Sequence, residues 1–182
     1  GRKRHTTRRR PHAPAARERG LPVTAEVSPH HLLLTDEACL GYDTNAKMNP
    51  PLRETSDVEA LRQGVVDGVI SILATDHAPH TADEKSLPFS EAPFGIIGLE
   101  TALAGYARAL VEQGHIDWAR LIELLTINPA RLCNLDREHL GENGLGELRE
   151  GGLADVTLID PAREWTVSES GLAGQSRNTP FL

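Results

Sequence analysis

The feature that most constrains the fold is a pair of short apolar runs with a helix between them. The runs are residues 22–27 and 69–75. Each is rich in β-branched residues, as buried strands are. Two strands joined through a loop and a helix pair in parallel, because a parallel connection needs a crossover of a dozen or more residues. We therefore predict an α/β fold.

The segment between the two runs carries the signals of a helix. Ser56 and Glu59 have the spacing of a capping box, and the apolar residues from Val58 onward line one face until Gly68 stops the helix. After the second run, Asp117 and the pair Asn128-Pro129 predict two further helix starts. The remaining elements that we predict are helices at 97–112, 118–125 and 128–132, a loop at 141–152, and strands at 153–160 and 165–167.

Charge is divided unevenly along the chain. Residues 1–19 carry eight of the 19 Lys and Arg residues and a single acid, whereas the other 163 residues carry 11 basic and 25 acidic side chains. An acidic body does not favour nucleic acid, because that binding rests on neutralising phosphates. Residues 1–20 show no periodicity and almost no aliphatic residues, so we expect a basic leader that is disordered or not native to the protein.

Composition also limits the compartment. No apolar run approaches the roughly 18 residues of a membrane helix, and no signal peptide is recognisable. Cys39 and Cys133 are too few and too far apart for a disulfide framework. We expect two reduced thiols in a cytoplasmic protein with no membrane partner.

Titratable side chains follow both predicted strands. Asp76, His77 and His80 come after the second strand, and His30 and His31 come shortly after the first. Loops after the carboxyl ends of parallel strands build active sites in α/β folds. Carboxylate and imidazole together suit a catalytic metal whose bound water has a pKa near 7. The alternative that stays open is structural: a turn cap at the aspartate and buried histidines that orient loops.

Four motifs then resemble those of one enzyme family. They are TAEVSPHHLLLTDE at 24–37, KMNPPLR at 47–53, ATDHAPHT at 74–81 and APFGIIGLET at 92–101. These motifs are similar to the carboxyl-terminal half of bacterial dihydroorotases, which are zinc amidohydrolases of pyrimidine biosynthesis. The segments INPARLCNL and GGLADVTLIDP resemble the next segments of chains in this superfamily. The resemblance covers residues 21–182. It implies the carboxyl-terminal part of a TIM-type (β/α)8 barrel over 21–140 and part of a small β-domain over 141–182.

The resemblance also implies an activity and a set of site residues. The family interconverts N-carbamoyl-L-aspartate and dihydroorotate on the route to UMP by making or opening a cyclic amide. Asp76 resembles the catalytic aspartate, which ligates metal and shuttles the proton. Asn49 and His80 resemble substrate-binding positions, and Phe94 and Gly95 resemble the pair whose backbone meets the substrate ring.

Other residues near these motifs receive lesser roles from the resemblance. Glu26 corresponds to a carboxylate near the metal, and His30 and His31 are structural residues rather than zinc ligands. The residue types at the main positions fit their roles physically. The amide of Asn49 offers both a donor and an acceptor, and glycine at position 95 lets the backbone approach a ligand closely.

The sequence also departs from the family. The motifs for the other metal ligands are missing: a His-x-His pair, a bridging acidic group or modified lysine, and two further histidines. One carboxylate cannot hold a catalytic zinc, which needs about three protein ligands. We therefore expect one or two Zn²⁺ ions only in a complete enzyme. Two strands of an opened barrel leave unpaired edges, so we expect this chain to be a piece of a longer enzyme, inactive and poorly folded alone.

Two alternatives remain open at this point. One is another cyclic amidohydrolase, such as an allantoinase or a hydantoinase. The other is a non-catalytic, dihydroorotase-like scaffold for aspartate carbamoyltransferase. The partners that the resemblance implies are a small-molecule substrate and either a homo-oligomer or a complex with that transcarbamoylase.

Overall fold

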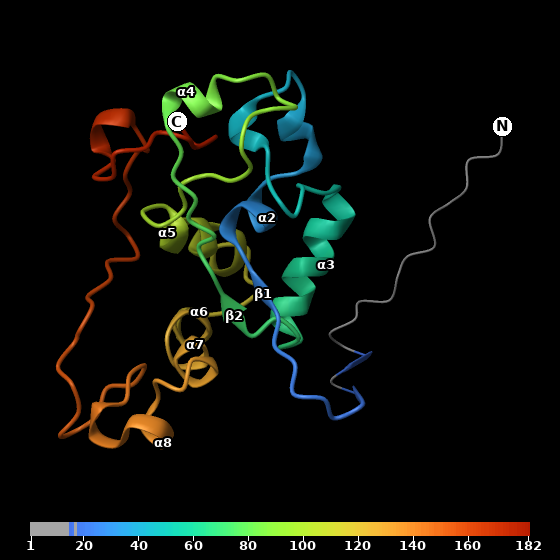
Figure 1. Cartoon of the computed structure of the whole chain (residues 1–182). Helices are drawn as coiled ribbons and strands as arrows, with labels where there is room; N and C mark the ends of the chain where they lie inside the picture. Colours follow the sequence, from blue (N-terminus) through green and yellow to red (C-terminus); the bar gives the residue numbers. More distant parts are fainter. Residues whose placement is uncertain (1–14, 17) are drawn as a thin grey trace.

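Two short parallel strands lie at the centre of the computed structural model (Figure 1). They are β1 (Glu26–Val27) and β2 (Ile72–Leu73), and Glu26 lies opposite Ile72 in the ladder. The structure describes residues 15–16 and 18–182. Most of the predicted basic leader, residues 1–20, therefore lies outside the described residues, and the division of the chain at residues 20 and 140 stays a prediction.

The parallel pairing of the two predicted strands is confirmed, but both strands are shorter than predicted. Backbone bonds from Ser71 N to Ala25 O and from Ala74 N to Val27 O extend the ladder by one step at each end. Beyond these bonds neither segment has a further strand beside it within the described residues. Extended backbone without a ladder partner is not a strand, which accounts for the early ends.

The connection between the strands is helical, as predicted. Its main helix, α3 (Thr55–Val66), begins after Glu54, whose side chain makes no cap hydrogen bond. The predicted capping box at Ser56 is therefore wrong, because Ser56 lies inside the first turn. The predicted stop is correct, since Gly68 follows the helix with φ +70°. The shorter elements of the connection are α2 (Pro29–Leu33) and the 3₁₀ turns Asp36–Cys39 and Thr44–Ala46.

A capping box does occur elsewhere, at α4 (Ala82–Lys85). The Thr81 hydroxyl accepts from Glu84 N at 3.2 Å, and the Glu84 carboxylate accepts from Thr81 N at 2.9 Å. This reciprocal pair satisfies two of the amide groups that a helix start leaves without partners. It stabilises the turn that immediately follows His80.

The long helix predicted for 97–112 starts five residues late. It comprises α5 (Ala102–Tyr106) followed by a π-helical stretch, η3 (Ala107–Val111). The missing first turn has other partners: Ile97 N donates to Asn178 O, and Gly98 N donates to the His77 ring. These tertiary bonds replace the helical ones, so local propensity is overridden.

Two of the later helices test the predicted caps. Helix α6 (Trp118–Leu125) is confirmed, including the bond from Arg120 N to the Asp117 carboxylate. Helix α7 (Ile127–Leu132) starts before the predicted cap, and the Asn128 side chain instead donates to Ser71 O at 2.9 Å. The remaining elements are α8 (Arg137–Leu140) and the 3₁₀ turns Gly141–Asn143 and Glu169–Gly171.

The strands predicted at 153–160 and 165–167 are wrong. Residues 153–167 form no helix or strand and run along the outside of the body before the chain returns beside α4 (Figure 1). Leu158 is 92% exposed. A strand needs a neighbour to receive its hydrogen bonds, and none lies beside this segment among the described residues.

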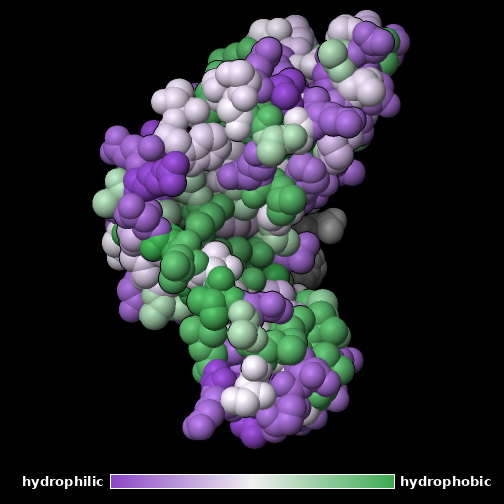
Figure 2. All heavy atoms as spheres, turned by 90° about the vertical axis from the view of Figure 1, so that its left-hand side faces the viewer, coloured by the Kyte–Doolittle hydropathy of each residue, from purple (hydrophilic) through white to green (hydrophobic). Residues whose placement is uncertain are grey.

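The apolar side chains form two clusters. The larger one packs β1 and β2 against α2, α5, η3 and α6, with Tyr106, Leu121 and Leu124 fully buried. The smaller one contains Met48 and Ile96 and receives Phe181 from the end of the chain. Apolar side chains also gather in a band across the middle of one face (Figure 2). No helix among the described residues is long and apolar enough to cross a membrane.

Candidate active site

Asp76 stands at the carboxyl end of β2, where the predicted site should lie. Its backbone has φ +50°, a conformation that aspartate tolerates better than most side chains. Its side chain is half exposed, with Oδ2 3.4 Å from His30 Nε2. The strand therefore ends by turning sharply and presenting a carboxylate at the rim.

A buried tyrosine holds the two strand ends together beneath this rim. The Tyr106 hydroxyl lies 2.6 Å from Val27 O and 2.7 Å from Ala74 O, the last carbonyls before the two polar loops. Burial and the nearby carboxylate of Glu26 raise the pKa of Tyr106, so the hydroxyl stays a donor. It bridges the carboxyl ends of both strands. The sequence contains no signal for this role, because a single tyrosine in a helix carries no motif.

A chain of hydrogen bonds runs from His30, the ring beside Asp76, across the rim to the loop that follows Asn49. His31 Nε2 lies 2.9 Å from Pro50 O, and the Ser28 hydroxyl lies 2.6 Å from His31 Nδ1 and 2.9 Å from His30 Nε2. A carbonyl only accepts, so His31 Nε2 carries the proton and Nδ1 accepts from Ser28. Ser28 then accepts from His30.

The charge state of His30 agrees with this order of donors. Burial, and to a lesser degree the neighbouring His31, lower the pKa of His30 from 6.5 to about 3. The ring is therefore neutral near pH 7, with one donor and one acceptor nitrogen. The contacts of both histidines are those of positioning side chains, which agrees with the structural role expected for them.

An open cleft brings three of the expected site residues together. Asp76, Asn49 and Glu26 line a cavity of about 380 Å³ beside β1, together with His31 and Arg53. Asn49 is exposed and precedes a cis peptide bond to Pro50. Arg53 was not singled out from the sequence. Its guanidinium is 62% exposed, and its Nε lies 3.3 Å from the Asp57 carboxylate.

The other expected residues form a second group. His80 Nε2 donates to Phe94 O at 3.0 Å, and Gly95 N donates to Lys47 O at 2.8 Å. Gly95 has φ +100°, and a Cβ there would lie 2.7 Å from the Cβ of Ala78, so this position requires glycine. The structure thus places His80, Phe94 and Gly95 in direct contact.

Two buried lysines hold the loop that carries Phe94. Lys47 Nζ donates to Ser90 O and Ala92 O and lies 4.6 Å from the centre of the Phe94 ring. Lys85 Nζ donates to Pro93 O and Gly95 O, each at 3.1 Å, and burial lowers its pKa. Compact ammonium groups with several donors suit clusters of carbonyls. No motif in the sequence indicates either role, although lysine is rare in this chain, with 16 of the 19 basic residues being arginine.

The described residues supply only part of a metal site. No group of three or more His, Cys, Asp or Glu side chains that could hold a metal occurs among residues 15–16 and 18–182. Asp76 offers one oxygen ligand at the rim, and a catalytic zinc needs about three protein ligands. A metal at Asp76 would therefore need ligands from outside the described part of the chain.

The fold and the site together define a class of protein. The parallel strand pair, with a carboxylate and histidines at one rim, has the arrangement found at the carboxyl ends of TIM-barrel strands. The chain belongs to the Amidohydrolase family, whose model matches residues 8–179. Members of this superfamily are generally metal-dependent.

Curated relatives and solved structures agree with this assignment. The chain is 50% identical over 167 residues to a dihydroorotase of Geobacter sp. (strain M21) and 49% identical over 168 residues to one of Carboxydothermus hydrogenoformans. Each match covers 92% of this chain and 37% of the relative. The chain thus spans little more than a third of the length of these relatives.

Two similar solved structures are hydantoinases. The D-hydantoinase of Bacillus sp. AR9 matches with a TM-score of 0.77 and 24% identity over 93% of this chain and 37% of that one. The L-hydantoinase of Arthrobacter aurescens matches with a TM-score of 0.68 and 26% identity over 77% of this chain and 30% of that one. The fold is therefore part of a TIM-type amidohydrolase barrel.

Proposed function

We propose that the protein carrying this chain is a dihydroorotase, which interconverts N-carbamoyl-L-aspartate and dihydroorotate. The observation that carries the proposal is the 50% identity to curated dihydroorotases across 92% of the chain. The two hydantoinase structures described above are only 24% and 26% identical. The cleft that joins Asp76 to Asn49 supports the proposal, because a cyclic amide needs a proton carrier and an amide-binding group side by side.

In this proposal Asp76 is the catalytic residue. Its half-exposed carboxylate accepts a proton from the attacking water and passes it to the ring nitrogen that leaves. The chain from Pro50 through His31, Ser28 and His30 orients the carboxylate relative to the Asn49 loop. Because burial keeps the His30 ring neutral, its part in this orientation does not require a charged imidazole near pH 7.

The remaining expected residues bind the substrate in this proposal. Asn49 presents an amide donor and acceptor to the ureide or to a carboxylate. His80 donates to a carboxylate, which requires its ring to leave Phe94 O or to share that donor. The backbone N–H of Phe94 has no hydrogen bond among the described residues, whereas Phe94 O, Gly95 N and Gly95 O are all bonded. It is therefore available as a further donor.

We also propose that Asp76 is one of the ligands of one or two Zn²⁺ ions. A bound Zn²⁺ lowers the pKa of its water to near 7. The proposed location is the cytoplasm, and the proposed assemblies are a homo-oligomer or a complex with aspartate carbamoyltransferase. The domain proposal is a barrel part over 21–140 and a small β-domain part over 141–182.

A second candidate function is a non-catalytic scaffold for aspartate carbamoyltransferase. One observation favours it: residues 15–16 and 18–182 contain no cluster of three metal-binding side chains. The shared cleft of Asp76, Asn49 and Glu26 argues against it, because a scaffold has no use for that arrangement.

The test is turnover by the purified protein after loading with Zn²⁺. Dihydroorotate, hydantoin and allantoin are compared as substrates. We expect dihydroorotate to be opened at least ~100-fold faster than either competitor, because a site built around hydrogen-bonding groups rejects analogues that leave them unpaired. Faster opening of hydantoin would replace the proposal with a hydantoinase. No turnover, with a transcarbamoylase retained on the protein, would replace it with the scaffold.

Two substitutions test the binding roles. Asn49→Ala and His80→Ala should each raise KM for dihydroorotate about tenfold with a smaller change in kcat, since both remove substrate contacts. Asn143→Ala is the control, because this exposed side chain lies in a distant turn. A loss confined to kcat would contradict the assignment of both residues to binding.

A further inference from the structure

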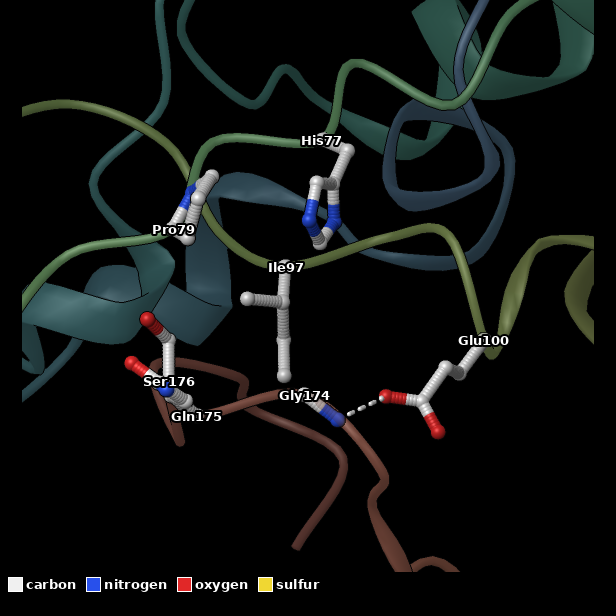
Figure 3. A pocket seen from close by; sticks show the side chains of 7 residues that line it. All are labelled: His77, Pro79, Ile97, Glu100, Gly174, Gln175 and Ser176. Carbon is white, nitrogen blue, oxygen red and sulfur yellow. Dashed lines mark hydrogen bonds between the residues drawn. The ribbon is translucent and has the colours of Figure 1, made fainter.

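The end of the chain returns to the site from far away in the sequence. Residues 173–179, which we name the C-terminal strap, lie against the loop that follows β2. Figure 3 shows Gly174, Gln175 and Ser176 facing His77 across a cavity of about 270 Å³. The strap is fixed at its start by Glu100, whose carboxylate accepts from Ala173 N at 2.9 Å and from Gly174 N at 3.1 Å.

Asn178 fixes the other end of the strap, and it does so inside the site. Its side chain is buried, with 4% exposure. Its Oδ1 accepts from His80 N at 3.1 Å, and its Nδ2 donates to Ala78 O at 2.9 Å and to Gly95 O at 3.3 Å. Its backbone carbonyl accepts from Ile97 N at 3.0 Å. One amide side chain therefore joins two loops that the sequence separates.

These bonds link three expected substrate-binding residues into a ring. Asn178 bonds the backbone of His80 and of Gly95, and the His80 ring bonds the carbonyl of Phe94. The direction of the His80 side chain thus depends on a backbone that Asn178 holds. No other side chain among the described residues bonds the His80 backbone.

The position of Gly95 depends less on Asn178 than the position of His80 does. Lys85 Nζ also donates to Gly95 O, and Gly95 N is bonded to Lys47 O. Loss of the Asn178 side chain would therefore leave Gly95 in place and free the backbone amide of His80, whose ring keeps only its contacts to Phe94 O and Glu84. The two ends of the strap also differ, because the Glu100 carboxylate hydrogen-bonds Ala173 N and Gly174 N, whereas the Asn178 side chain hydrogen-bonds the substrate loops.

We propose that Asn178 is a positioning residue, through which the C-terminal strap holds His80 in the arrangement that binds the substrate carboxylate. This inference rests on the proposed dihydroorotase function. It assigns a role in substrate binding to a residue 98 positions away from its partner along the chain.

The experiment compares Asn178→Ala, Asn178→Asp and the control Asn143→Ala in the Zn²⁺-loaded protein. Steady-state kinetics with dihydroorotate give KM and kcat, and amide hydrogen exchange reports on individual backbone groups. For Asn178→Ala we expect KM to rise about tenfold, or about 1.4 kcal/mol, while kcat stays within about threefold. Asn178→Asp keeps an acceptor for His80 N, so its KM should lie between those of the wild type and Asn178→Ala.

Hydrogen exchange at two amides distinguishes a positioning role of Asn178 from a general loss of stability. In Asn178→Ala the His80 amide loses its acceptor and should exchange at least ~10-fold faster. The Ile97 amide bonds the backbone carbonyl of residue 178 and should keep its protection. Loss of protection at both amides, with a lower melting temperature, would overturn the proposal in favour of a purely structural role.

The outcomes also separate this inference from the proposed function. If the wild type turns over dihydroorotate and Asn178→Ala keeps its KM, the positioning role is wrong and the function stands. If the wild type does not turn over dihydroorotate, the function fails. In that case, unchanged hydrogen exchange of the His80 amide in Asn178→Ala would show that the Asn178 side chain does not hold the His80 backbone.

Discussion

Segments 69–75 and 153–160 are both rich in aliphatic and β-branched residues, but only the first contains a strand. Ile72 and Leu73 pair with β1 and are 5% exposed, whereas Val156 and Leu158 are 58% and 92% exposed. The two segments differ in whether another strand and a helix lie beside them. The first segment has a parallel partner and a helical layer, and the second has neither among the described residues. Strand propensity therefore produces a strand only where a ladder and a packed face are available.

The largest expected difference is in activity, between removing the carboxylate that follows segment 69–75 and removing one in segment 153–160. Asp76→Ala should lower kcat for dihydroorotate by about 10³-fold, within the range for a proton-transfer group. Asp155→Ala, in the exposed segment, should leave kcat unchanged. The measurement is steady-state turnover of the Zn²⁺-loaded protein. Wild-type turnover by Asp76→Ala would remove the aspartate from the mechanism.

A leucine of the cluster that packs against β2 and a leucine of segment 153–160 should differ strongly in their effect on stability. Leu124 is fully buried in the larger cluster, so Leu124→Ala should lower the free energy of unfolding by about 2–5 kcal/mol. Leu158→Ala should change it by less than about 0.5 kcal/mol. Urea titration followed by circular dichroism measures both. Equal losses would mean that the exposed segment is packed in the protein in solution.

The two tyrosines of the chain give a finer comparison. Tyr106→Phe keeps the buried ring but removes the donor of Ala74 O, whereas Val27 O keeps its bond from Ala74 N. An unsatisfied buried polar group costs about 1–3 kcal/mol. Tyr42→Phe is the control, because Tyr42 is 76% exposed. If both variants unfold at the same urea concentration, the tyrosine does not stabilise the strand ends.

The smallest expected effect is a local response to pH at the C-terminal strap. Hydrogen bonds from Ala173 N and Gly174 N lower the pKa of Glu100 below its ordinary value of 4.5. A lowered carboxylate pKa adds stability above that value, which is lost as the pH falls through the lower, folded-state pKa. NMR shifts of both amides should therefore move below pH 4.5. Glu100→Gln should abolish that movement, and an unchanged titration would show that another group is responsible.

Elements with local signals were predictable from the sequence. The cap at Asp117, the stop at Gly68 and the parallel pairing all depend on residues close together in the chain or on a connection rule. The late start of α5 was not predictable, because the bonds that replace its first turn come from Asn178 and His77. Those partners are separated from it in the sequence.

The site divides in the same way. The motifs identified Asp76, Asn49, His80, Phe94 and Gly95 as candidates, and their roles remain predictions. They contained no signal for Tyr106, Lys85 or Asn178, since a lone tyrosine, lysine or asparagine has many ordinary roles. Only contacts across the fold distinguish these three from surface residues of the same type.

The sequence by itself determined the family, the parallel α/β arrangement and the rim that carries Asp76. These depend on motifs and on short-range patterns, which a chain keeps whatever its surroundings. The tertiary structure alone decided where each strand ends, which donors hold the Phe94 loop and how the C-terminal strap reaches His80. Each of these depends on a hydrogen-bond partner far away in the sequence, and burial makes such partners obligatory.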